Sequence, residues 1–133
     1  MMVQRAKTLS ISIGCPPAQV CEFVNNPANL PQWAKGLCKS ARPAGDHWLL
    51  DTPSGELFFR FVPPNPFGVL DHFVGAPGGE VYVPMRVIAN GEGSELLFTL
   101  FQSPTLPDAA FAADEKLVAQ DLLSLKALLE AAR

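Results

Sequence analysis

The sequence predicts an α+β fold in which an antiparallel sheet wraps around one long C-terminal helix. Two patterns lead to this prediction: an apolar stripe at helical spacing over residues 107–131, and before it a series of strand-like segments separated by Gly- or Pro-containing turns. Short turns between consecutive strands imply antiparallel pairing. The length of 133 residues is typical of one domain. We therefore expect a single domain over residues 1–133, with a sheet of seven strands.

The composition excludes several classes of protein. The chain is 48% hydrophobic and 17% charged, which excludes a disordered protein. Its net charge of −3 argues against nucleic-acid binding, which needs a basic surface to displace counterions. No uncharged run reaches the roughly 18 residues of a membrane span. Three cysteines, an odd number without metal-site spacing, favour reduced thiols and a cytoplasmic protein.

The N-terminal segment predicts one strand and two short helices. Residues 8–13 alternate apolar and polar side chains, which is typical of a strand. Pro16 and Pro17 suit the first turn of a helix, which we expect to end at Asn25-Asn26-Pro27. A second short helix is expected over about 27–33.

The middle of the chain predicts six further strands. The segments are rich in Phe, Val, Leu and Trp, and each is followed by a turn that contains Gly or Pro. They cover residues 37–42, 46–51, 55–62, 68–74, 80–89 and 94–102.

The last segment predicts a helix over residues 107–131, about 37 Å long at ~1.5 Å per residue. Thr105 and Asp108 are spaced like a capping box. Leu117 and Leu128 are expected to widen the apolar face. The apolar stripe comprises Phe111, Val118, Leu122, Leu125 and Leu129, whereas Asp108, Asp114, Glu115 and Lys116 are expected on the solvated face. Such a helix must cover a large surface, and the sheet is the one available.

The order of these elements, with the segment Asn26-Pro27…Leu30-Pro31-Gln32-Trp33, resembles the SRPBCC (START-like, helix-grip) superfamily. Three further segments, together with the helix opening Phe111-Ala-Ala-Asp114, look like bacterial members described as polyketide cyclase/dehydrase-like. These segments are Gly68-Val-Leu-Asp-His72, Val81-Tyr-Val-Pro-Met-Arg-Val87 and Gly93-Ser-Glu-Leu-Leu-Phe-Thr-Leu-Phe101. The resemblance covers nearly the whole chain. It implies a curved sheet that grips the long helix, with an apolar cavity between them. Because the superfamily holds lipid carriers, cyclases, hydroxylase domains and stress proteins, it is more informative about fold than about activity.

Motifs for phosphate, dinucleotide and nucleophile chemistry are absent from the sequence. There is no glycine-rich fingerprint after a predicted strand, no phosphate loop and no nucleophile elbow. The two histidines, His47 and His72, would need distant cysteines or carboxylates to form a zinc site. We therefore expect neither a metal site nor a cofactor.

His72 is the first candidate for chemistry. Neighbouring side chains of a strand point to opposite faces, so Asp71 and His72 cannot form a catalytic dyad. We expect His72 inside, because a neutral imidazole costs less to bury than a carboxylate. It is then either a structural histidine bonded to a protein acceptor or a general base in the cavity.

The register of residues 80–89 decides the role of Tyr82 and Arg86. In the register that we favour, Met85 lies opposite Phe98 and faces the helix, which places Tyr82 and Arg86 on the outer face. The opposite register would bring both into the cavity, as acid and oxyanion-stabilising candidates.

Large apolar side chains supply the candidate cavity wall. They would either fill a core or line a water-excluding cavity that admits a hydrophobic ligand. The candidate lining residues are Trp33, Trp48, Phe59, Phe61, His72, Met85, Phe98, Val118 and Leu122.

Three functions follow from these candidates. The favoured one is binding of a small lipid-, polyketide- or aromatic-like molecule in the cavity. The first alternative is an enzyme of the cyclase/dehydratase type, with His72 as general base and Tyr82 or Arg86 stabilising an oxyanion. The second is a non-catalytic module that forms a homodimer through an outer face carrying Tyr82, Leu97 and Phe101.

Overall fold

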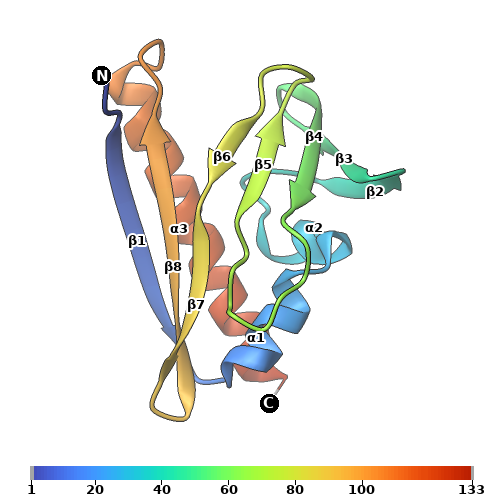
Figure 1. Ribbon diagram of the computed structural model, residues 1–133, viewed down its shortest axis with the longest axis vertical. Coiled ribbons are helices and arrows are strands. Elements are labelled where there is room, and N and C mark those ends of the chain that lie inside the picture. Colours follow the sequence, from blue (N-terminus) through green and yellow to red (C-terminus); the bar gives the residue numbers. More distant parts are fainter. Residues whose placement is uncertain (1, 133) are drawn as a thin grey trace.

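In the computed structural model, which describes residues 2–132, antiparallel strands curve around one long C-terminal helix (Figure 1). The predicted fold class is therefore confirmed. The elements are, in chain order, β1 (Arg5–Ile13), α1 (Pro17–Val24), the 3₁₀ helix η1 (Pro27–Asn29), α2 (Leu30–Trp33), β2 (Ser40–Ala44), β3 (His47–Thr52), β4 (Gly55–Phe61), β5 (His72–Gly75), β6 (Val81–Val83), β7 (Met85–Asn90), β8 (Gly93–Gln102) and α3 (Asp108–Ala131).

The prolines and asparagines of the N-terminal helices act as the sequence predicts. Pro17 begins α1, and the carbonyl of Pro16 accepts the N–H groups of Gln19 at 3.0 Å and of Val20 at 3.2 Å. The Asn26 side chain accepts from the N–H of Ala28 at 3.1 Å and so caps the next turn. The predicted second helix consists of η1 followed by the single α-helical turn of α2. The buried residues of this stretch are Val20, Val24, Pro27, Leu30 and Trp33.

The predicted strand 80–89 is two strands, β6 and β7, separated by Pro84. Proline has no N–H to donate, so a ladder cannot continue through it. The Pro84 carbonyl still accepts the N–H of Thr99 at 3.0 Å. The described part of the chain therefore holds eight strands where seven are expected, in the orders β2-β3-β4-β5-β6 and β1-β8-β7. The segment from β6 to β7 passes from one group of strands to the other (Figure 1).

Residues 68–70 also connect the two groups, although the predicted strand 68–74 becomes regular only at β5. Leu70 donates its N–H to the carbonyl of Met85 at 2.8 Å, and Val87 donates to the carbonyl of Gly68 at 2.9 Å. Gly68 has φ +74°, and a Cβ at this position would collide with the carbonyl oxygen of Val87. A glycine is therefore required at this crossing.

The register of β7 on β8 is the favoured one, since Met85 lies opposite Phe98. Met85 and Val83 are buried, whereas Tyr82 and Arg86 are exposed. The side chains alternate between the two faces of the sheet across the break at Pro84.

α3 differs from the prediction at its start. It begins at Asp108 after Pro107 and has no side-chain cap, so Thr105 does not form the expected capping box. The Asp108 carboxylate instead accepts from the side-chain amide of Gln102 at 2.8 Å. Leu117 and Leu128, expected to widen the apolar face, lie beside the stripe and are 43% and 37% exposed. Within the stripe, Phe111, Leu122, Leu125 and Leu129 are buried and Val118 is half-buried.

The C-terminal half of α3 is fastened to the end of β1. Lys126 Nζ donates to the carbonyl of Ser12 at 2.7 Å, and the Glu130 carboxylate accepts the N–H of Gly14 at 2.8 Å. Leu122, Leu125 and Leu129 of this half are at most 3% exposed. None of the helices within residues 2–132 combines the length and the apolar character needed to cross a membrane.

Candidate functional site

A cavity of about 360 Å³ lies between the sheet and α3. Its walls come from α2 and the residues that follow it, from β4, β5, β6 and β8, and from the part of α3 between Asp114 and Asp121. Six of the nine predicted lining residues border it, namely Trp33, Phe59, Phe61, His72, Phe98 and Val118. The exposed residues Val81, Asp114 and Leu117 border it too, so the cavity opens to solvent between β6 and α3.

Three predicted lining residues do not border the cavity. Met85 and Leu122, 0% and 2% exposed, are enclosed by the apolar core. Trp48 is half-buried on β3, one strand beyond the wall that β4 supplies. Strand alternation and helical spacing identify the inward-facing residues, but they do not say how deep each one lies.

His72 faces this cavity from β5. It is 5% exposed, stacks on Phe59 with ring centroids 5.0 Å apart, and meets the rings of Phe61 at 5.5 Å and Phe98 at 5.7 Å. Burial lowers the pKa of His72 from 6.5 to about 4. The imidazole is therefore neutral at pH 7.

The partner of His72 Nδ1 determines the tautomer. Nδ1 lies 3.1 Å from the carbonyl oxygen of Leu70. Because a carbonyl oxygen can only accept, we assign the proton to Nδ1. Nε2 is then an acceptor, and within residues 2–132 it has no hydrogen-bond partner.

Trp33 supplies an unpaired donor in the same wall. The residue is 4% exposed, and among the described residues its Nε1–H is the buried side-chain polar group without a hydrogen-bond partner. Leaving such a group unsatisfied costs about 1–3 kcal/mol. The sequence suggested Trp33 as an apolar wall residue, but nothing in it indicated that the indole N–H would lack a partner.

Two carboxylates of α3 complete the polar part of the cavity. The Asp121 carboxylate accepts the N–H of Gly36 at 3.1 Å, and Asp114 lies at the opening. Desolvation raises the pKa of both carboxyl groups. No Lys or Arg of the described chain lines the cavity. Asp114, expected on the solvated face of the helix, is exposed and also borders the cavity.

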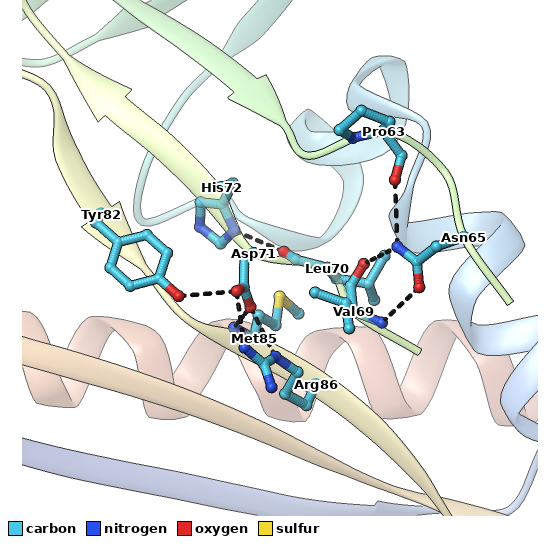
Figure 2. Close-up of polar contacts among 9 residues, drawn as sticks. All are labelled: Pro63, Asn65, Val69, Leu70, Asp71, His72, Tyr82, Met85 and Arg86. Atoms are coloured by element: carbon cyan, nitrogen blue, oxygen red, sulfur yellow. Dashed lines mark hydrogen bonds and ion pairs between the residues drawn. The ribbon is translucent and has the colours of Figure 1, made fainter. Parts of the chain in front are cut away.

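Tyr82 and Arg86 lie on the other face of the sheet from His72, with Asp71 (Figure 2). Asp71 Oδ1 accepts from Arg86 Nε and from the N–H of Met85, both at 2.9 Å. Its Oδ2 accepts from Arg86 Nη2 at 2.9 Å and from the Tyr82 hydroxyl at 2.8 Å. The opposite register does not occur, so the hypothesis that Tyr82 and Arg86 act beside His72 in the cavity is wrong.

Asp71 is a residue whose importance the sequence reasoning missed. It is 5% exposed, although the carboxylate of the Asp71–His72 pair was expected to be the costlier of the two to bury. The hydrogen bonds from Arg86 are the largest cause that lowers the pKa of Asp71 to about 2. Tyr82 on β6 and Arg86 on β7 were both expected on the outer face, and this expectation could have indicated that the Asp71 carboxylate has partners there.

A second hollow, of about 760 Å³, lies between α1, β7 and the loop of residues 64–70. Asn65 shapes this loop by accepting the N–H groups of Phe67 at 3.0 Å and Val69 at 3.2 Å, and by donating to the carbonyl of Pro63 at 3.2 Å. Figure 2 shows Asn65 between Pro63 and Val69. Phe67, on the wall of this hollow, is 81% exposed.

Within residues 2–132, no group of three or more His, Cys, Asp or Glu side chains is arranged to hold a metal ion. Cys15 and Cys38 are buried and Cys21 is half-buried, all as free thiols.

No protein-family model matches the chain, and the sequence of no curated protein matches it either. Solved structures do match it. XoxI from Bacillus cereus superposes with a TM-score of 0.75 at 17% identity, covering 93% of this chain and 94% of that one. The Aha1 dimer from Colwellia psychrerythraea gives 0.74 at 17% identity, with 97% of each chain covered. Ara h 8.0201 gives 0.71 at 12% identity, covering 97% of this chain and 99% of that one. These structural neighbours are SRPBCC, or Bet v1-like, proteins, and the chain has their helix-grip fold.

Proposed function

We propose that the protein binds a small hydrophobic molecule in the cavity between the sheet and α3. The observation that carries the proposal is an open space of about 360 Å³ whose wall includes Phe59, Phe61 and Phe98. Ligand cavities commonly measure about 300–1,000 Å³ and combine apolar walls with a few polar groups. This cavity lies at the small end of that range, which suits a compact ligand rather than a long acyl chain.

The ionisation of His72 supports binding over catalysis. An efficient general base at neutral pH has a pKa near the working pH, whereas the pKa of His72 is lowered to about 4. A cyclase or dehydratase would also need a group to stabilise an oxyanion. Tyr82 and Arg86, the candidates for that role, instead bond to Asp71 on the outer face.

The test is a titration with N-phenyl-1-naphthylamine, an uncharged probe that fluoresces in apolar surroundings. We expect saturable binding. The substitution Val118→Trp should weaken it at least tenfold, because Val118 lines the cavity and the larger indole would occupy part of the cavity volume. Leu123→Trp is the matched control: it adds the same ring to the same helix, at a residue that is 60% exposed and does not line the cavity.

Two results would contradict the proposal. One is an absence of saturable binding. The other is that Val118→Trp binds the probe as tightly as the wild type does, whereas Ile88→Glu loses binding. Because Ile88 lines the second hollow, this result would place the probe there. Native mass spectrometry of freshly purified protein complements the titration, because a bound small molecule and the oligomeric state appear in one spectrum.

A further inference from the structure

The hydrogen-bonding atoms at the cavity wall are few. On the β5 side, His72 Nε2 is an acceptor because its Nδ1–H is committed to the carbonyl of Leu70. The surrounding aromatic rings cannot satisfy this lone pair: Phe59 stacks on the imidazole, and Phe61 and Phe98 meet it edge-on. A ligand that fills the cavity and displaces water from Nε2 must therefore bring an O–H or N–H donor, or leave this acceptor unpaired at a cost.

Trp33 borders the cavity with another part of its ring. Its indole N–H is enclosed and has no acceptor within the described chain, so a ligand in the open cavity does not contact it. The hydrogen-bonding atom that the aromatic side of the wall offers to a ligand is therefore His72 Nε2, and a hydroxyl group can donate to it.

The charges at the wall restrict the ligand further. Asp114 and Asp121 line the α3 side, and neither forms an ion pair with a described residue. His72 is the other ionisable side chain at the wall, and it is neutral at pH 7. An anion entering the cavity would meet carboxylates and no cation, and repulsion between like charges is strong where water is partly excluded.

We propose that the cavity selects uncharged apolar molecules that bear a hydroxyl group, and that it discriminates against carboxylates such as fatty acids. This inference rests on the proposed function, since it names the chemistry of the ligand at the same site. Its grounds are the unpaired acceptor of His72 at the cavity wall and the two α3 carboxylates without a balancing cation.

The test compares three ligands of the same shape at pH 7: 2-naphthol, 2-methylnaphthalene and 2-naphthoate. Each displaces N-phenyl-1-naphthylamine from the wild-type protein, and its affinity follows from the displacement curve. We expect 2-naphthol to bind at least fivefold more tightly than 2-methylnaphthalene, because the hydrocarbon leaves the His72 Nε2 acceptor unpaired. We expect 2-naphthoate to bind at least tenfold more weakly than 2-naphthol.

Variants assign each preference to its residues. His72→Phe keeps an aromatic ring but removes the acceptor, so it should abolish the preference for 2-naphthol over 2-methylnaphthalene. Trp33→Phe removes only the enclosed N–H and should keep this preference. The double variant Asp114→Asn/Asp121→Asn should strengthen 2-naphthoate binding several-fold and leave the affinity for 2-methylnaphthalene unchanged. Glu115→Gln is the control for net charge, because Glu115 is on the same helix but does not line the cavity. If His72→Phe does not fold, the comparison of the three ligands in the wild type and in the aspartate variants still decides the outcome.

The two proposals fail in different ways. If the fluorescent probe itself does not bind, the proposed function is wrong, and the proposal about the ligand class is wrong as well. If the probe binds but 2-methylnaphthalene or 2-naphthoate competes as well as 2-naphthol, the cavity binds apolar molecules without the proposed selectivity. Equal effects of Glu115→Gln and the double aspartate variant would overturn the role given to Asp114 and Asp121.

Discussion

Asp71 and His72 are neighbours in the chain and both are buried, but their surroundings favour different charge states: Asp71 is ionised and His72 is neutral. His72 is held among aromatic rings and has one carbonyl partner, so its charged form is disfavoured. Asp71 is held by Arg86, Tyr82 and a backbone N–H, so its charged form is favoured. The sequence predicted that the two side chains point to opposite faces. It could not predict that both are buried, because that depends on Arg86 covering Asp71 from the next strand.

The carboxylate of Asp71 should make the protein sensitive to strong acid. Its pKa is about 2 in the folded protein and near 3.9 in the unfolded chain, so its stabilising contribution is complete above pH ~4 and is lost as the pH falls toward 2. Asp71→Asn should lower the free energy of unfolding at pH 7 by about 2 kcal/mol, since Arg86 is half-exposed and solvent screens the pair. Urea denaturation measures this change, with Glu92→Gln in the exposed β7–β8 turn as control. An Asp71→Asn variant with the same acid profile as the wild type would show that the ion pair contributes nothing.

His72 should affect the free energy of unfolding at higher pH than Asp71 does. Its pKa is lowered from 6.5 to about 4, so between these values the unfolded chain takes up a proton that the folded protein does not. The free energy of unfolding should therefore fall as the pH decreases from 6.5 to 4, and His72→Phe should remove this slope. The same urea series measures it, with His47→Gln as control. If the slope persists in His72→Phe and disappears in His47→Gln, the assignment is wrong.

At the scale of elements, the crossing between the two strand groups depends on Gly68. A side chain there would need φ +74° and would collide with the Val87 carbonyl oxygen. We expect Gly68→Ala to lower the free energy of unfolding by about 3 kcal/mol. Gly78→Ala is the matched control, because Gly78 has φ +79° but open space around its Cβ position, so it should cost only about 1 kcal/mol. Equal losses in a denaturant titration would mean that the close approach to Val87 does not matter.

The elements themselves were largely predictable, and the exceptions have physical causes. Apolar spacing identified α3, and alternation with turn residues identified every strand region. The division at Pro84 was missed because the apolar residues alternate through it without a change of phase, although the missing N–H of proline was a readable signal. Leu117 and Leu128, expected to widen the apolar face, lie at its partly exposed edges, where leucine is also common.

At the scale of the whole molecule, the sequence predicted which side chains face inward better than it predicted which ones border empty space. Met85 and Leu122 face inward, but the core encloses them. The depth of a side chain depends on how far the sheet curves from α3, and no local pattern records that distance. The polar character of the cavity was not predicted either, because it depends on the approach of Asp121 to Gly36 and on a tautomer that the Leu70 carbonyl imposes on His72.

The two halves of α3 contribute to different properties of the protein, and this separation has a consequence for evolution. Its C-terminal half is tied to β1 and buries Leu122, Leu125 and Leu129, so changes there threaten folding. The half before it contributes Asp114, Leu117 and Val118 to the cavity, and these side chains are exposed or half-buried. Under the proposed function, substitutions at these three positions would change which ligand is preferred while the buried contacts of the C-terminal half remain intact. Ligand preference would then evolve without loss of folding stability.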